Sequence, residues 1–215
     1  FHPWTDTNAL AWARVLGTPS REFVPADYNG DGTNELAVYI PANGKWYIQT
    51  LAGSNLVWGS SLGIAGAVPV PADYDGDQKV DMGVYDSGSG NWYARRLNGT
   101  NIFWARNWGF GGQTPAPGDY DGDGRADLGL INKDNANWSI QSLDSNVLAW
   151  ARNWGYKGVQ FAPADYDGDG GTDLAAYDPD SGVWYIIALS SNLLSWAVPQ
   201  IADGTAMPAD YDGDG

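Results

Sequence analysis

The chain has 215 residues, 43% of them hydrophobic and 13% aromatic, which is enough apolar material for a packed core and excludes a disordered chain. It contains no cysteine, which excludes disulfides, zinc–thiolate sites and thiol nucleophiles. The formal charge is −15, and no run of about 18 apolar residues exists, so we expect neither a nucleic-acid partner nor a membrane span.

A period of about 46 residues organises the chain, and three markers keep it in phase. Internal repeats of this length are typical of propellers, solenoids and arrays. The markers are the Asp of a recurring Pro-Ala-Asp-Tyr segment (Asp27, Asp73, Asp119, Asp165, Asp210), one Trp set (Trp12, Trp58, Trp104, Trp150, Trp196) and a second Trp set (Trp46, Trp92, Trp138, Trp184).

Within the first full repeat, residues 24–28 form a short strand-like run that ends at an Asp-rich loop. Residues 36–40 follow the loop and are rich in β-formers. After a Pro-Ala-Asn-Gly turn, residues 45–51 alternate and predict a third strand, and residues 56–62 predict a fourth. Four short antiparallel strands in about 46 residues are typical of one propeller blade.

The sequence therefore predicts an all-β fold, a single β-propeller over residues 1–215. We expect five blades, closed by pairing of the N- and C-terminal strands, which removes the exposed sheet edges. The alternative is a fragment of a larger ring or array. The expected parts are 1–23 (third and fourth strands of the closing blade), the blades 24–69, 70–115, 116–161 and 162–206, and 207–215 (first strand and truncated loop of the closing blade).

Eighteen of the 26 acidic residues lie in five short loops, with oxygen-bearing side chains at loop positions 1, 3, 5 and 9. Hard oxygen ligands in this number predict Ca²⁺, with position 7 supplying a backbone carbonyl. The sets are Asp27, Asn29, Asp31, Thr33 and Glu35; Asp73, Asp75, Asp77, Lys79 and Asp81; Asp119, Asp121, Asp123, Arg125 and Asp127; Asp165, Asp167, Asp169, Gly171 and Asp173; and Asp210, Asp212 and Asp214. We expect four complete sites and possibly a fifth. The second site is expected to be the weakest, because Gln78 replaces the position-6 glycine there.

Two other interpretations of the loop were weighed. An EF-hand or dockerin-type loop needs its last carboxylate at position 12 before a helix, but position 12 is Val38, Val84, Leu130 or Ala176. A set of metal-free Asx-turns would leave three or four carboxylates repelling one another in each loop. Metal binding is favoured over both.

The loops and the strand after them resemble FG-GAP or VCBS-type repeats, as in integrin α-subunit and some fungal lectin propellers. The resemblance implies that the loop joins the first two strands of a blade and that its residues at positions 1, 3, 5, 7 and 9 hold Ca²⁺. The repeat here is shorter than in integrins, and Pro-Ala-Asp-Tyr and Ala-Val-Tyr stand where Phe-Gly and Gly-Ala-Pro are typical. These departures bear on blade number and ligand.

No catalytic constellation is found: the single histidine, His2, has no partners at fixed spacing, and the repeat accounts for nearly all carboxylate pairs. We therefore expect a non-enzymatic, extracellular recognition module that binds a glycan. The alternatives are an integrin-like protein-interaction or adhesion scaffold, and a propeller appended to a secreted enzyme. A monomer is expected.

Both recurrent Trp sets are expected to pack between blades. The segments that vary after the fourth-strand Trp supply candidate ligand contacts, because a Trp beside Arg and Asn suits a sugar ring. Packing between blades is nevertheless the favoured role for these residues as well, and ligand contact is the second. The candidates are Arg106, Asn107, Trp108, Arg152, Asn153 and Trp154.

Overall fold

The computed structural model describes residues 21–190, 193–199 and 204–207, which form four antiparallel sheets of four strands each. Within each sheet the strands pair in chain order, so each sheet is one meandering blade. The all-β propeller architecture predicted from the repeat is confirmed. Among the described residues, no helix is long and apolar enough to cross a bilayer.

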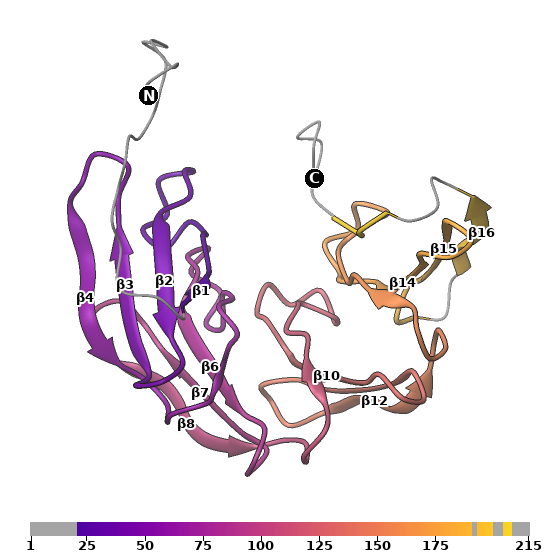
Figure 1. Cartoon of the computed structure of the whole chain (residues 1–215), viewed down its shortest axis with the longest axis horizontal. Helices are drawn as coiled ribbons and strands as arrows, with labels where there is room; N and C mark the ends of the chain where they lie inside the picture. The colour runs from indigo at the N-terminus through magenta and orange to yellow at the C-terminus, as the bar shows by residue number, and fades with distance from the viewer. Residues whose placement is uncertain (1–20, 191–192, 200–203, 208–215) are drawn as a thin grey trace, which may run out of the picture.

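The blades repeat their strand bounds at intervals of 46 residues. The strands are β1 Glu22–Phe23, β2 Leu36–Ile40, β3 Lys45–Gln49 and β4 Asn55–Ser61; β5 Val68–Pro69, β6 Met82–Asp86, β7 Asn91–Arg95 and β8 Asn101–Asn107; β9 Thr114–Pro115, β10 Leu128–Asn132, β11 Asn137–Gln141 and β12 Val147–Asn153; and β13 Gln160–Phe161, β14 Leu174–Asp178, β15 Val183–Ile187 and β16 Leu193–Pro199. The blades follow one another along an open arc, with the fourth strands β4, β8 and β12 on its outer side (Figure 1).

The prediction of five blades is wrong, because the described residues form four. Every blade pairs its first strand with its second and its second with its third. Residues 1–215 contain no second-strand sequence for a fifth blade, so the strand needed to join the two end segments is missing. Those segments, residues 1–20 and 208–215, lie outside the described residues.

The first strand of each blade begins earlier than predicted. The sequence favoured residues 24–28, whereas β1 covers Glu22–Phe23. Pro25 has no N–H for the ladder, and the N–H of Tyr28 donates to the Glu35 carboxylate at 2.9 Å instead of to a strand. Pairing with the second strand still reaches Ala26, whose carbonyl accepts the N–H of Glu35 at 2.8 Å, and the Asp-rich loop begins after it.

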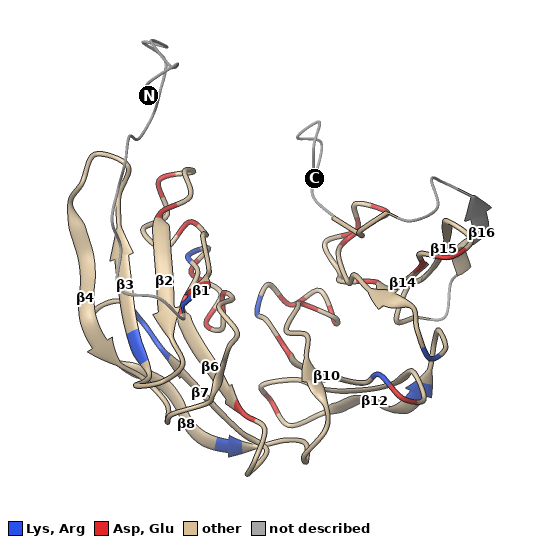
Figure 2. Cartoon of the chain, in the orientation of Figure 1, with Lys and Arg blue, Asp and Glu red and all other residues tan. Residues whose placement is uncertain are grey.

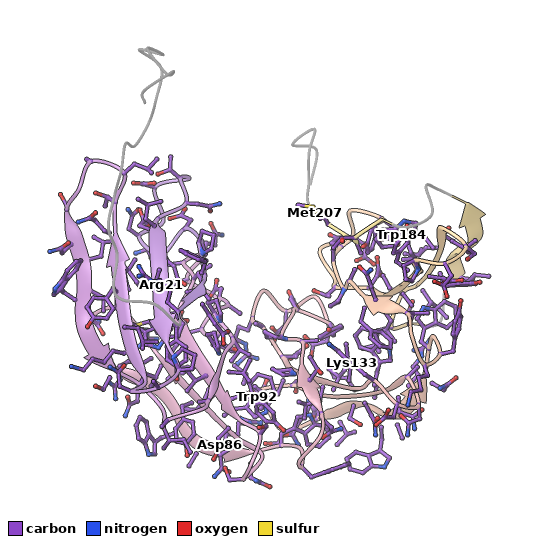
Figure 3. The ribbon with its side chains drawn as sticks, in the orientation of Figure 1. Arg21, Asp86, Trp92, Lys133, Trp184 and Met207 are labelled. Carbon is purple, nitrogen blue, oxygen red and sulfur yellow. The ribbon has the colours of Figure 1, made fainter. Side chains whose placement is uncertain are left out.

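The core lies between consecutive blades, where the third-strand Trp of one blade meets the second strand of the next. Trp46 shares a buried cluster with Met82 and Val84 of the second blade. Trp92 and Trp138 make the equivalent contacts and, like Trp46, are fully buried. Trp184, labelled with Trp92 in Figure 3, is only half-buried, since no described blade follows it. Packing between blades is thus confirmed for the third-strand Trp residues.

The fourth-strand Trp residues that the structure describes are largely exposed. The prediction that they pack between blades is wrong for Trp58 and Trp104, whose rings contact Tyr47 and Tyr93 of their own blades, whereas Trp150 contacts Trp108 from the preceding blade. Trp58, Trp104 and Trp150 are 55%, 54% and 66% exposed. The residue after each has a positive φ, at Gly59, Ala105 and Ala151. The register between the third and fourth strands shifts at this point, as a β-bulge does. Because side chains alternate with a period of two, the extra residue turns the Trp to the outer face.

Candidate metal centre

Each Asp-rich loop is a closed turn between the first and second strands of its blade. A backbone bridge pairs the residue before the loop with loop position 9 in all four blades: Ala26 with Glu35, Ala72 with Asp81, Gly118 with Asp127 and Ala164 with Asp173. The second strand begins directly after position 9, at Leu36, Met82, Leu128 or Leu174. The loop thus leads into a strand and not into a helix, as position 9 predicted.

The position-1 carboxylate shapes the turn by accepting backbone N–H groups from within the loop. Asp119 accepts from Gly122 at 2.7 Å and from Gly124 at 2.8 Å. The same pair of contacts recurs at Asp27, Asp73 and Asp165. Position 6 has a positive φ in every loop, which glycine adopts freely, and in the second loop Gln78 is held there at +64°.

The position-9 acid is buried beneath the loop. Glu35, Asp81, Asp127 and Asp173 are all at most 3% exposed, and each accepts the N–H of the position-2 Tyr at 2.9–3.1 Å. That Tyr donates its hydroxyl to a backbone carbonyl four residues earlier, which locks the strand against the loop. Burial raises the pKa of Asp81 and Asp127 to about 7 and that of Asp173 to about 6.

In three loops the acids at positions 1, 3 and 9 converge. Each residue offers a carboxylate oxygen, and within each group these oxygens lie within 4.8 Å of one another. The groups are Asp73, Asp75 and Asp81; Asp119, Asp121 and Asp127; and Asp165, Asp167 and Asp173. A buried carboxylate beside two others is stable only with a proton or a cation among them, so these residues fit a metal ion.

The first loop is different, and it is not among the converging acidic groups. Its position 3 is Asn29, whose Nδ2 donates to Glu35 Oε1 at 2.8 Å and to Asp31 Oδ2 at 3.0 Å. The amide therefore supplies part of the positive character that a cation supplies in the other loops. Asn29 still carries a carbonyl oxygen as a possible ligand.

Positions 5 and 7 are linked to each other in every loop. The N–H of Thr33, Lys79, Arg125 or Gly171 donates to the position-5 carboxylate two residues earlier, at 2.8–3.0 Å. The position-5 acid is not part of the converging groups. Metal ligation by positions 5 and 7 stays a prediction, and Asp210, Asp212 and Asp214 lie outside the described residues.

Consecutive loops are hydrogen-bonded to one another. The backbone carbonyl of Asp27 accepts the N–H of Val80 at 2.9 Å, and the Asp73 and Asp119 carbonyls accept from Ala126 and Thr172 at 2.6 and 2.5 Å. Position 1 of one loop is thereby fixed to position 8 of the next. Figure 2 shows the acidic residues concentrated on loops along the inner side of the arc.

A second candidate site, an aromatic pocket of about 450 Å³, lies where the third and fourth blades meet. Asn153, Trp154, Gly155 and Tyr156 line it from the end of β12 and the loop that follows, and Tyr185 of β15 lines it from the other side. The rings of Tyr156 and Tyr185 stand nearly perpendicular, with centroids 6.2 Å apart. Asp178, which accepts a hydrogen bond from the Tyr156 side chain, places a carboxylate beside this wall.

The six predicted ligand residues all have structural contacts. Arg106 and Arg152 donate to backbone carbonyls of the next blade, at Leu143 and Leu189. The indoles of Trp108 and Trp154 also donate across the junction, to Ser139 and Tyr185. The amides do not cross it: Asn107 donates to Ser89 and Asn91, and Asn153 to Asn135 and Asn137, all within their own blades. Only Asn153 and Trp154 also line the aromatic pocket.

Tyr156, Tyr185 and Asp178 were not predicted from the sequence. Departure from the repeat was an available signal for Tyr156, which stands where the first two blades have Ile64 and Phe110. Tyr185 follows the repeat, because the first two blades carry Tyr47 and Tyr93 at this position and the third carries Ser139. At the junction with Ser139, Trp150 contacts Trp108 edge-on at 5.5 Å.

The buried position-9 acids lead to a prediction for the metal-free protein. Their raised pKa values mean that the native state binds protons more tightly than the unfolded chain, in which Asp titrates near 4. Proton binding by these acids therefore stabilises the native state fully below about pH 4, and this contribution is lost as the pH rises through about 7. We expect Asp127→Asn to raise the Tm of the metal-free protein relative to the wild type at pH 8, and to have less effect at pH 4.5.

The measurement is a series of calorimetric melts between pH 4.5 and 8, on protein stripped of metal. With a bound cation, the same substitution is expected to lower the Tm at pH 8, because it removes a ligand. A metal-free Asp127→Asn variant that melts below the wild type at pH 8 would contradict the assignment of a buried, uncompensated carboxylate.

Comparison with known proteins supports the repeat assignment. A family model described as the FG-GAP-like repeat matches residues 73–130, which run from the second Asp-rich loop to the strand after the third. No curated protein sequence matches the chain significantly.

Solved structures share the architecture. A virginiamycin B lyase from Staphylococcus aureus superposes with a TM-score of 0.57 at 12% identity, over 86% of this chain and 58% of that one. An Agrocybe aegerita lectin that recognises non-reducing terminal N-acetylglucosamine superposes with a TM-score of 0.54 at 16% identity, over 80% and 50%. A Bacteroides caccae protein of unknown function superposes with a TM-score of 0.52 at 12% identity, over 86% of this chain and 70% of that one. The chain thus spans only about half the length of the first two proteins, and at these identities the similarity is one of fold.

Proposed function

We propose that this chain, a β-propeller of the FG-GAP-like repeat type, is a calcium-stabilised recognition module that binds carbohydrate outside the cell. The observation that carries the proposal is the aromatic pocket at the junction of the third and fourth blades, on a scaffold whose acidic groups are used by the metal loops. The pocket combines ring faces of Trp154, Tyr156 and Tyr185 with hydroxyl and carboxylate groups. Such a wall suits a sugar, whose apolar face stacks while its hydroxyls take hydrogen bonds.

Calcium is the cation that the loops favour. The converging oxygens are all carboxylates, and the loops offer further amide or backbone oxygens at positions 3 and 7. Calcium accepts six to eight such ligands, whereas zinc prefers nitrogen and sulfur, and the chain has one His and no Cys. Bound calcium would neutralise the loop carboxylates. Loops exposed to solvent in this way typically need the calcium concentrations found outside cells, which supports an extracellular setting.

A non-catalytic role is supported by the use of the acids. In the described blades, the converging carboxylates lie in loops that recur from blade to blade, as structural ligands do, and not in one singular group. The lyase among the similar structures shares the fold at 12% identity, which carries no activity to this chain. The lectin supplies the choice of a first probe, N-acetylglucosamine, beside a panel of other terminal sugars.

The test is a binding titration of the wild-type protein and two matched variants in the presence of calcium. Tyr185→Ser introduces the residue that the third blade carries at this position, and it removes one wall of the pocket. Tyr93→Ser makes the same change at the junction of the first and second blades, outside the pocket. We expect Tyr185→Ser to weaken sugar binding at least about tenfold and Tyr93→Ser to leave it within twofold.

Two results would overturn the proposal. One is the absence of binding to every sugar in the panel. The other is binding that Tyr185→Ser does not weaken, since the ligand would then lie elsewhere. Circular dichroism of both variants checks that the blades remain folded.

A further inference from the structure

The metal loops differ in which basic side chain lies beside them. The residue that follows the third strand is Arg96 in the second blade, Ser142 in the third and Ala188 in the fourth. Arg96 contacts the loop of its own blade, and Ala188 lines a groove with the loop of its own blade. Position 7 of the loop varies as well, through Lys79, Arg125 and Gly171. The charge around three otherwise similar acidic groups therefore changes from blade to blade.

In the second loop, Arg96 makes a direct ion pair with a predicted metal ligand. Its Nε donates to Asp75 Oδ2, and Asp75 is one of the three converging acids. The Asp75 side chain is only 9% exposed, while that of Arg96 is 42% exposed. The guanidinium therefore reaches from solvent into the acidic group and takes an oxygen that a metal ion would need. Lys79 lines the same groove, with its stem near Gly30 of the first loop.

In the third loop the basic side chain, Arg125, does not contact the converging acids. Arg125 pairs with Asp123 at 2.5 Å and with Asp144 at 2.9 Å. Asp123 is the position-5 acid and lies outside the converging group of Asp119, Asp121 and Asp127. The three converging carboxylates of this loop thus keep their oxygens free of ion pairs within the described part of the chain.

In the fourth loop there is no basic side chain at either position. Gly171 and Ala188 replace them, and both line the groove between the third and fourth loops. Among the described residues, no ion pair reaches Asp165, Asp167 or Asp173. This acidic group is the least compensated of the three.

We propose that Arg96 is a built-in counter-ion of the second loop, which competes with calcium for Asp75 and makes this loop the last of the three converging acidic groups to fill. The inference rests on the calcium binding proposed above. A divalent ion at this loop must displace the guanidinium from Asp75. Within the described part of the chain, no ion pair occupies the converging carboxylates of the third and fourth loops. At low calcium Arg96 stays paired with Asp75 and the second loop holds no metal, while the third and fourth loops already do.

The experiment measures calcium binding by isothermal titration on metal-free protein, with terbium luminescence as a second readout. Arg96→Ser introduces the residue that the third blade carries. Arg95→Ser is the matched control: it removes the same charge from the adjacent residue, whose guanidinium contacts Asn101, the Ser61 carbonyl and the Trp104 ring and not a loop. We expect Arg96→Ser to tighten the weakest binding step about tenfold, and Arg95→Ser to change it less than twofold.

Asp75→Asn identifies the step. It is expected to remove the weakest calcium-binding step and leave the tighter steps unchanged. Equal effects of Arg96→Ser and Arg95→Ser, no effect of Arg96→Ser, or loss of a tight step in Asp75→Asn would each overturn the role of Arg96 while leaving calcium binding in place. A wild-type protein that binds no calcium would overturn both this role and the calcium part of the proposed function.

Discussion

Removal of calcium is expected to lower the Tm of this protein by about 20 °C. A ligand that binds only the native state at 100 times its Kd contributes about 2.7 kcal/mol per site, so three acidic loops contribute about 8 kcal/mol together. For a domain of about 200 residues, 1 kcal/mol corresponds to about 2–4 °C in Tm. The unfolded chain lacks the turn that brings positions 1, 3 and 9 together, so it binds the ion poorly.

The measurement compares calorimetric melts in excess chelator and in millimolar calcium. Magnesium at the same concentration serves as the control and is expected to stabilise less, because it needs a stricter octahedron and retains its water. A Tm that is the same in chelator and in calcium would refute calcium binding by the loops.

Trp138→Ala is expected to lower the free energy of unfolding by about 3–5 kcal/mol, as large-to-small changes at fully buried aromatic residues do. Trp138 is fully buried, packs edge-on against Phe161 at 5.5 Å and donates its indole N–H to the Trp154 carbonyl at 3.0 Å. The substitution opens a cavity between the third and fourth blades and removes this hydrogen bond to the Trp154 carbonyl.

Trp150→Ala, in the same blade, is the matched control, because this Trp is 66% exposed. Its cost is expected to be about 1 kcal/mol or less. Urea unfolding curves of both variants in calcium measure the difference. Equal destabilisation by the two substitutions would mean that the two Trp sets do not divide into buried and exposed.

The hairpin at the metal loop was predictable because its determinants are local. Position 9 carries the last acid and position 10 begins a β-branched or apolar run, so the prediction of a strand after the loop is confirmed at Leu36, Met82, Leu128 and Leu174. Glycine at position 6 indicated a left-handed residue, and its φ is positive in the first, third and fourth loops. These features depend on residues fewer than ten positions apart.

The aromatic residues show where local reasoning fails. Trp46 and Trp58 recur with the same period and have the same side chain, yet one is fully buried and the other is 55% exposed. The difference comes from a bulged residue, Gly59, which shifts the register between β3 and β4 by one. In the next two blades alanine occupies the bulge position, at Ala105 and Ala151, so no glycine signals the bulge there.

The aromatic pocket and the Arg96–Asp75 pair also lay beyond sequence reasoning. Tyr156 and Tyr185 come from different blades, and Arg96 is 21 residues from the acid that it contacts. Neither pairing has a spacing rule, because each depends on how one strand or blade is placed against another.

The repeat, the all-β architecture and the acidic loops follow from the sequence alone, since a 46-residue period and alternating strands act over short distances that the chain itself records. The tertiary structure decided the number of blades, the outward orientation of Trp58, Trp104 and Trp150, and the position of Arg96 beside its loop. The physical reason is common to all three: they are set by contacts and register between strands. In each described blade the second strand joins the first to the third, and a side chain faces the core only when the register of its neighbour allows it.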